Sequence, residues 1–342
     1  MPEAVIHPWA LRDGSLDAGR EERDLVAQLH HGVTDLRGLV PVRLFRGEPA
    51  MVDIGDPHAE RITRAQHAAP LRYNQNMQLA QFEAHAGMEE RHWWFLGRRL
   101  ILQTLLHELL PPSPDRGRER PLLVPAERPL LIDVGSGTGG LTEFLSREYT
   151  VIGVEPTADG IEFSRKRFPH CTYIHGYAPQ DVPQLREADA VLLIEVLEHV
   201  EKDVELVHAL IDAMKPGAYL MMLAPADMSL WGPHDDAFEH FRRYDGIEGF
   251  RKLWSGTSVD ELLVSHCMRR LYPVVKWMRR LSKLRGKSWG KGGTDIEIPM
   301  APVNAFLRWF YSGEAKVLLR ALRHEGKGYA KGVSVVGVLR KK

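Results

Sequence analysis

The stretch LLIDVGSGTGG at residues 130–140 decides the fold, and the stretch VIGVE at residues 151–155 follows it closely. The apolar start of the first stretch predicts a buried strand, and its glycines allow a tight turn in which the backbone approaches a ligand. A helix that begins near Leu141 would then point its first amide groups at that ligand. Glu155 ends a second strand, where nucleotide-binding sheets present a carboxylate to ribose hydroxyls. The sequence therefore predicts a nucleotide cofactor.

The glycines alone do not identify the cofactor, because Gly135, Gly137 and Gly140 also have the dinucleotide spacing G-x-G-x-x-G. The acid in front of them is more specific. The pattern D-x-G-x-G-x-G at residues 133–139, with Glu155 after it, resembles the first two motifs of class I S-adenosylmethionine-dependent methyltransferases. This resemblance covers most of residues 85–342. It implies that the cofactor is S-adenosylmethionine, with the following candidate binding residues: Asp133, Gly135, Gly137, Gly139, Glu155, Tyr177 and Glu195.

The chain departs from this family after its third predicted strand. Many members have an Asp there that receives the adenine amino group, whereas this chain has HGYAP at residues 175–179. Tyr177 is a candidate to stack on the base in its place. Asp181 is a weaker substitute.

Strands and helices alternate regularly after the second strand. The alternation predicts an α/β fold, namely a Rossmann-like, seven-stranded, mostly parallel sheet with helices on both faces. The resemblance adds that the last strand is antiparallel. The expected strands are residues 171–176, 189–196, 218–224 and 332–339, and the expected helices are residues 159–167 and 203–214.

The chain is expected to have three parts. Residues 1–70 form an N-terminal extension of unknown role, and residues 71–128 form a helical cap with a proline-rich linker. Residues 129–342 form the S-adenosylmethionine-binding methyltransferase domain, with a helical insertion at about 273–325.

The N-terminal extension carries two local signals. Glu21–His31 is a candidate short helix, and Leu39–Phe45 with Ala50–Ile54 predicts a hairpin. Packing, homodimer formation and substrate recognition all stay open as roles for this extension.

Composition excludes several classes of protein. The chain has 45 Lys and Arg against 45 Asp and Glu, so its formal charge is zero and nucleic acid is not an expected partner. Its two cysteines, Cys171 and Cys267, provide neither a disulfide framework nor a structural zinc site. No apolar run reaches the roughly 18 residues that span a bilayer, and the first residues lack the apolar core of a signal peptide. We expect a cytoplasmic enzyme with a small-molecule acceptor.

Aromatic and basic residues concentrate in HWWFLGRR at residues 92–99. In many class I methyltransferases a helical segment before the first strand lies across the cofactor cleft. Trp93, Trp94 and Phe95 resemble that cap, since large flat side chains close a pocket and exclude water. Their burial against the sheet is the alternative, which stays open.

The loop after the fifth strand, PADMSLWGPHDDAFEHFRRY at residues 225–244, is dense in polar and aromatic residues. Loops at the carboxyl ends of parallel strands carry function. Together with HWWF, this block resembles a bacterial subgroup of methyltransferases with the signature P-A-x-x-x-L-W-x-x-H-D…H-x-R-R-Y. For a hydroxyl acceptor, His234 or His240 is the candidate base, oriented by Asp235 or Asp236. The candidate acceptor contacts in the loop are Trp231, Arg243 and Tyr244.

A second polar group follows the fourth strand. Glu195, Glu198 and His199 have the spacing E-x-x-E-H, which places them on one side of a helical turn. This spacing resembles the divalent-metal site of small-RNA 2′-O-methyltransferases and of ubiquinone-pathway O-methyltransferases, with His240 as a further ligand. The set would suit Mg²⁺ or Mn²⁺. The sequence Leu-Glu-His-Val is also common in methyltransferases that use no metal, so both alternatives stay open.

Residues 264–291 contain nine Lys or Arg and no Asp or Glu, interleaved with apolar residues. This pattern predicts a basic amphipathic helix. A lid with a solvated face is one interpretation. A surface for an anionic acceptor or for membrane headgroups is the other.

The expected activity is methyl transfer from S-adenosylmethionine to a hydroxyl, on a sugar-containing or other polar metabolite. N- or C-methylation is the alternative within the same class. A partner protein that binds the cofactor without catalysis is a further alternative. The polar loop at residues 231–244 favours catalysis, because a scaffold has no need of it.

Overall fold

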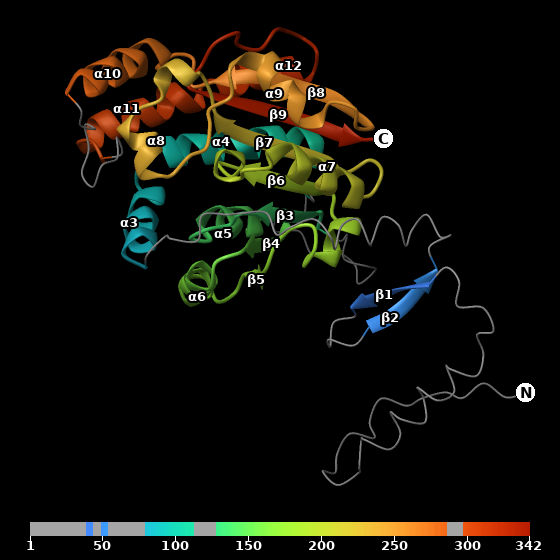
Figure 1. Cartoon of the computed structure of the whole chain (residues 1–342). Helices are drawn as coiled ribbons and strands as arrows, with labels where there is room; N and C mark the ends of the chain where they lie inside the picture. The colour runs from blue at the N-terminus through green and yellow to red at the C-terminus, as the bar shows by residue number, and fades with distance from the viewer. Residues whose placement is uncertain (1–38, 44–48, 54–78, 113–127, 286–296) are drawn as a thin grey trace, which may run out of the picture. The chain divides into compact units, whose positions relative to one another are not determined.

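The structure, a computed structural model, describes residues 39–43, 49–53, 79–112, 128–285 and 297–342 (Figure 1). The chain divides into two compact units, Met1–Ala68 and Ala69–Lys342. In the first unit, β1 (Leu39–Arg43) pairs antiparallel with β2 (Pro49–Asp53). This pairing confirms the predicted hairpin. The helix predicted at Glu21–His31 lies outside the described residues.

The second unit contains the predicted seven-stranded sheet, with the strand order β5-β4-β3-β6-β7-β9-β8. Its strands pair in parallel except at β9, which is antiparallel to both of its neighbours. The fold prediction is therefore confirmed. The strands are β3 (Leu130–Val134), β4 (Thr150–Glu155), β5 (Thr172–His175), β6 (Ala190–Ile194), β7 (Tyr219–Pro225), β8 (Val259–Cys267) and β9 (Ser334–Lys341).

Helices precede the sheet, connect its strands and form an insertion. The described helices are α3 (Leu79–Glu89), α4 (Trp93–Leu109), α5 (Gly140–Ser146), α6 (Ala158–Arg167), α7 (Asp203–Ala213), α8 (Pro233–Ala237), α9 (Gly246–Arg251), α10 (Tyr272–Arg285), α11 (Ala301–Ser312) and α12 (Ala315–Leu322). Short 3₁₀ turns are η1 (Pro183–Arg186), η2 (Leu197–His199), η3 (Met228–Leu230) and η4 (Lys252–Trp254).

Both faces of the sheet are buried by apolar clusters. Consecutive side chains of a strand point to opposite sides, so each central strand contributes to both clusters. On β3, Leu131 joins an apolar cluster with side chains of α4 and α12, such as Leu102 and Leu318. The next residue, Ile132, joins a second cluster with side chains of α7 and α9. All of these side chains are out of contact with solvent, so the central strands are apolar along most of their length.

The chain changes direction between β3 and β6, which lie side by side at the centre of the sheet. From β3 it continues to β4 and β5 on one side, and from β6 it continues to β7 on the other. In open α/β sheets, ligands bind outside the carboxyl ends of the strands at this point. The glycine turn follows β3 and Glu195 follows β6, so the candidate site residues gather at this edge.

In the described part of the segment between β8 and β9 lie the helices α10, α11 and α12, where the sequence predicts a helical insertion. Glu314, at the start of α12, is fully buried, and its carboxylate accepts hydrogen bonds from the amides of Arg269 and Arg270. The start of α10 is thereby held to the start of α12. Within the described residues, no helix combines the length and apolar character needed to cross a membrane.

Candidate active site

The glycine turn joins β3 to α5. Gly135, Gly137 and Gly139 all have positive φ, which L side chains rarely adopt. A Cβ at Gly135 would lie 2.6 Å from Val196 Cγ2, and a Cβ at Gly139 would lie 2.9 Å from Ser164 Cβ. A Cβ at Gly137 would meet no described atom within 4 Å. Close packing therefore explains the first and third glycines, whereas Gly137 borders open space.

Two buried carboxylates flank this turn, as the sequence predicts. Asp133, at 2% exposed, is the penultimate residue of β3 and accepts a 2.7 Å hydrogen bond from the Thr142 hydroxyl. Burial raises the pKa of Asp133 to about 6. Glu155 ends β4, and its carboxylate accepts hydrogen bonds from the amides of Gly137 and Thr157. The turn and both carboxylates thus form one polar edge around the space that Gly137 faces.

Helix α3 covers part of this edge. Phe82 is buried, and a Cβ at Gly160 would lie 3.1 Å from Phe82 Cζ and 2.9 Å from Glu155 Cγ. At the other end of α3, a Cβ at Gly140 would lie 2.5 Å from Glu89 Oε2. The sequence predicts a cap in this region, but it assigns the cap to the tryptophans of α4. It gives no role to Phe82 or Glu89.

The structure adds a cation, Arg98, to which the sequence analysis assigns no role of its own. Arg98 projects from α4, with its guanidinium 4.4 Å from the centre of the Trp94 ring and 3.5 Å from Glu195 Oε1. Its Nε and Nη1 atoms are buried and have no hydrogen-bond partner within the described part of the chain. The positive charge of Arg98 also favours the ionised form of Asp133, which opposes the effect of burial on the pKa of that carboxyl group. The site therefore offers donors to an anionic group.

Three of the four predicted metal ligands come together. One ligand atom each from Glu198, His199 and His240 lies within 4.8 Å of the other two. Glu198 is fully buried, and its carboxyl group lies beside that of Glu195, with no donor group among the described residues bound to its oxygens. Burial, followed by the charge of Glu195, raises the pKa of Glu198 well above its usual value. Glu195, the fourth predicted ligand, is not in this group, and it lies between Glu198 and Arg98.

Burial also keeps the neighbouring imidazole neutral, because it lowers the pKa of His199 to about 3, with His240 adding to the shift. The rings of His199 and His240 lie 4.7 Å apart, edge to face. The group therefore combines one carboxyl group with two imidazoles.

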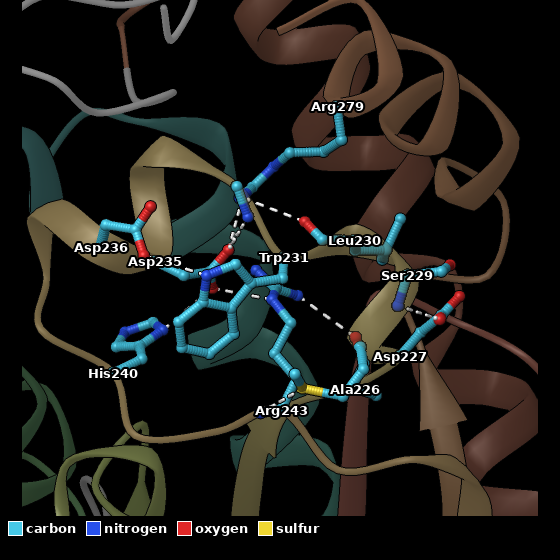
Figure 2. Close-up of polar contacts among 12 residues, drawn as sticks. Ala226, Asp227, Ser229, Leu230, Trp231, Asp235, Asp236, His240, Arg243 and Arg279 are labelled. Carbon is cyan, nitrogen blue, oxygen red and sulfur yellow. Dashed lines mark hydrogen bonds and ion pairs between the residues drawn. The ribbon is translucent and has the colours of Figure 1, made fainter. Parts of the chain in front are cut away.

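Asp235, in α8, is a fully buried carboxylate on which four donors converge (Figure 2). Its Oδ1 accepts from His240 Nδ1 at 3.0 Å and from Arg243 Nε at 2.7 Å. Its Oδ2 accepts from Arg279 Nη1 at 2.8 Å and from the Gly232 amide at 2.9 Å. Burial alone would raise the pKa of Asp235, but the His240 hydrogen bond and the two guanidinium groups hold it below its usual range.

An ionised Asp235 accepts hydrogen bonds and cannot donate them, so Nδ1 of His240 carries the proton of that contact. Neutral His240 then has an unprotonated Nε2. A carboxylate that orients an imidazole in this way is the usual support for a general base or for a metal ligand. Of the two orienting acids that the sequence leaves open, the structure places Asp235 at His240, whereas Asp236 accepts from Trp231 Nε1 at 3.0 Å.

The other predicted loop residues occupy different surroundings. The His234 ring lies 4.8 Å from the Phe238 ring, and burial lowers the pKa of His234 to about 3. Arg243 is bound to Asp235, as described above. Tyr244 is buried in the core, where its hydroxyl donates a 2.6 Å hydrogen bond to Asp203. Trp231 and His234 are half-buried, and their contact with an acceptor stays a prediction.

The predicted cap tryptophans lie at the start of α4. The Trp93 ring packs edge to face on Tyr311, and the Trp94 ring packs on Phe95 and Arg98. Both are half-buried, whereas Phe95 is fully buried. A role of these tryptophans in covering the cofactor stays a prediction.

The predicted adenine contacts lie in the loop after β5. Tyr177 is half-buried, and its amide donates a 2.7 Å hydrogen bond to Asp181 Oδ2. This bond engages the Asp181 carboxylate in closing its own loop. Stacking of Tyr177 on a base stays a prediction.

The sheet order, the glycine turn at the switch point and the polar edge around it define a Rossmann-like enzyme with a nucleoside-type cofactor. A family model described as a methyltransferase domain matches residues 93–265, just over half of the chain. The chain belongs to this family. It is a class I S-adenosylmethionine-dependent methyltransferase.

Solved structures show similarity at low identity. Geranyl diphosphate C-methyltransferase from Streptomyces coelicolor A3(2) is 14% identical, with 64% of this chain and 73% of that chain covered and a TM-score of 0.41. A SAM-dependent methyltransferase from Archaeoglobus fulgidus is 15% identical, with 63% and 86% covered and a TM-score of 0.37. Phosphoethanolamine N-methyltransferase 2 from Haemonchus contortus is 14% identical, with 70% and 52% covered and a TM-score of 0.41. No curated protein matches the chain. Nothing about the acceptor follows from these likenesses.

Proposed function

We propose that this methyltransferase transfers the methyl group to a hydroxyl of a polar, sugar-containing metabolite, and that His240 activates this hydroxyl. The observation that carries the proposal is the imidazole of His240, held by the buried, ionised carboxylate of Asp235 at 3.0 Å. O-methylation needs such a group, because the acceptor oxygen must lose a proton. The polar loop around it, with Trp231 and His234 half-buried, suits a polar acceptor.

The residues at the sheet edge fit the cofactor. Asp133 would hold its amino group, Glu155 its ribose hydroxyls and Arg98 its carboxylate, while the open side of Gly137 leaves room for it. Ser136 Oγ is buried without a hydrogen-bond partner among the described residues, and it offers one more polar contact. S-adenosylmethionine brings an activated methyl group, so the chain has to bind, align and deprotonate.

His240 is the group that moves the proton. With Nδ1 bound to Asp235, its Nε2 accepts the proton of the acceptor hydroxyl as the methyl group is transferred. Arg243 and Arg279 keep Asp235 ionised, which favours the imidazolium that forms. His234 is the second candidate base, and its lowered pKa makes it the weaker one.

A divalent metal is the alternative to His240 as a free base, because Nε2 of His240 cannot bind an ion and accept the proton at the same time. Glu198, His199 and His240 would hold Mg²⁺ or Mn²⁺, which would lower the pKa of the acceptor hydroxyl and orient it. The fit rests on the buried carboxyl group of Glu198, to which no donor group of the described residues is bound, and on the two imidazoles that converge on it. Such a carboxyl group is costly unless it binds a cation or stays protonated. Asp235 would then be the carboxylate that orients a ligating His240.

Titration with Mn²⁺ by calorimetry tests the metal. Wild type is expected to bind one ion, and Glu198→Gln to bind it at least about tenfold more weakly. The matched control is Glu201→Gln, an exposed acid nearby, which should bind as wild type does. Absence of binding, together with turnover that a chelator leaves unchanged, would reject the metal and leave His240 as an unaided base.

Product analysis tests the acceptor class. The enzyme is incubated with S-adenosylmethionine and a panel of sugars, glycosides, amines and carbon nucleophiles, and the methylated atom is identified by mass spectrometry and NMR. An O-methyl product supports the proposal. A product methylated on nitrogen or carbon would instead support the alternative, in which His240 has another role.

Cofactor binding is tested at the glycine turn. Gly137→Leu places a side chain in the open space, so affinity for S-adenosylhomocysteine should fall below detection by calorimetry. Gly217→Leu is the matched control, since Gly217 also has positive φ and open surroundings but lies in the turn before β7. Equal affinity of the two variants would contradict the assigned cofactor position.

A further inference from the structure

Exposed apolar side chains concentrate on two helices of the insertion. Within the described residues, ten large apolar side chains are exposed, and seven of them lie on α10, on α11 or directly before α11. Trp277 is 62% exposed and Trp309 is 68% exposed, which is unusual for tryptophan. The other five are Val274, Leu284, Met300, Val303 and Phe306.

The same two helices carry positive charge without acids. Helix α10 contains Lys276, Arg279, Arg280, Lys283 and Arg285, helix α11 contains Arg308, and neither helix contains Asp or Glu. Arg279 is buried against Asp235, but Arg280 and Arg308 are exposed. The exposed surface of these helices therefore combines aromatic and aliphatic side chains with cations that no acid of either helix neutralises.

The helices are also held together at one end. The Arg270 guanidinium, just before α10, donates a 3.0 Å hydrogen bond to the carbonyl of Phe310 in α11 and lies over the Phe310 ring. Figure 1 shows both helices at the same end of the second unit. We call the exposed side chains of Val274, Trp277, Arg280, Leu284, Met300, Val303, Phe306, Arg308 and Trp309 the α10/α11 surface.

The inner side of α10 is anchored to the site. Arg279 Nη1 donates to Asp235 at 2.8 Å, and the Tyr272 hydroxyl donates to Asp227 at 2.5 Å. These contacts use the polar side chains of α10 that face the protein. The side chains of Trp277 and Leu284 on the same helix are exposed to solvent.

We propose that the α10/α11 surface docks on a lipid bilayer with anionic headgroups. Helices with Trp, Phe and Leu between Lys and Arg lie in the interfacial plane of such bilayers, where the apolar side chains enter and the cations meet lipid phosphates. Charge favours this occupant over a second copy of the chain. A two-fold interface would bring the cations of one copy against those of the other, with no acid on either helix to neutralise them.

Vesicle sedimentation tests the proposal with the full chain. Wild type is expected to bind phosphatidylcholine vesicles that contain phosphatidylglycerol at least about tenfold more strongly than pure phosphatidylcholine vesicles, and to lose this preference in high salt. Arg280→Ala with Arg308→Ala should weaken binding about 25-fold, from a factor of about five per cation. Trp277→Ser with Trp309→Ser should weaken it at least about tenfold.

Two control variants separate the surface from general effects. Lys166→Ala with Lys331→Ala removes two exposed cations elsewhere, and Val204→Ser removes an exposed apolar side chain of α7. Both controls should bind vesicles as wild type does. Binding that does not depend on anionic lipid, or that the controls weaken equally, would overturn the proposal. So would a dimer in solution that the tryptophan variant dissociates, in the absence of vesicle binding.

Discussion

Replacing Asp235 by Asn should destabilise the protein and disable the site together. The carboxylate accepts four hydrogen bonds, two on each oxygen. Asn replaces one oxygen by an amino group, so two donors lose their acceptor and face another donor. Arg243 and Arg279, both nearly buried, also lose their counter-charge. Removing one partner of a buried ion pair costs about 3–5 kcal/mol of unfolding free energy, and this site has two such pairs.

The same change acts on His240. An amide does not hold Nδ1 in the protonated form as a carboxylate does, so the imidazole loses its fixed tautomer. Loss of an oriented base lowers turnover by about 100-fold or more. Affinity for S-adenosylhomocysteine should change little, because Asp235 lies outside the glycine turn.

Urea unfolding and methyl transfer measure the two effects. The matched control is Asp236→Asn, the adjacent but exposed acid, whose effect on unfolding should stay within about 1 kcal/mol. If both Asn variants unfold at the same urea concentration and turn over like wild type, the role assigned to Asp235 is refuted.

Two more predictions concern the cofactor. Since burial raises the pKa of Asp133 to about 6, the ionised form that attracts the cofactor's ammonium group is present above this pH and is lost below it. Calorimetry should show that S-adenosylhomocysteine affinity falls below about pH 6 by up to tenfold per pH unit, and Asp133→Asn should bind weakly without this pH dependence; a flat wild-type profile would contradict the assignment. Removal of residues 1–68 should leave the affinity unchanged, whereas removal of residues 1–90, which includes α3 and its buried Phe82, should lower it at least about tenfold. Equal affinity of the two folded fragments would remove α3 as a cover.

The sheet and the glycine turn are predictable from sequence because their physical causes are local. Central parallel strands are buried on both faces, so they appear as short apolar runs, and positive φ leaves glycines at fixed spacing. The proximity of Glu198 and His199 can be predicted from sequence just as well, because the turn after β6 places neighbouring residues together. The structure adds His240 to them, which the sequence proposes only through a family resemblance.

The remaining parts of the site depend on contacts between distant segments. Asp235 and Asp236 are adjacent and alike in sequence, and the buried acid is distinguished by contacts that include Arg279, 44 residues away on α10. Arg98 lies in an aromatic and basic block, HWWFLGRR at residues 92–99. The tryptophans of this block suggest a cap, and nothing in the sequence distinguishes Arg98 from its basic neighbour. Phe82 and Glu89 acquire their positions only when α3 packs near Gly160 and Gly140.

The central claim is that His240 activates the acceptor beside the cofactor. The most direct measurement is the rate of S-adenosylhomocysteine release with the accepted substrate, in wild type, in His240→Ala and in His170→Ala, an exposed histidine that serves as control. The account predicts that His240→Ala loses about 100-fold or more in turnover while cofactor affinity and folding are preserved, and that His170→Ala matches wild type. Full turnover of a folded His240→Ala variant would contradict it.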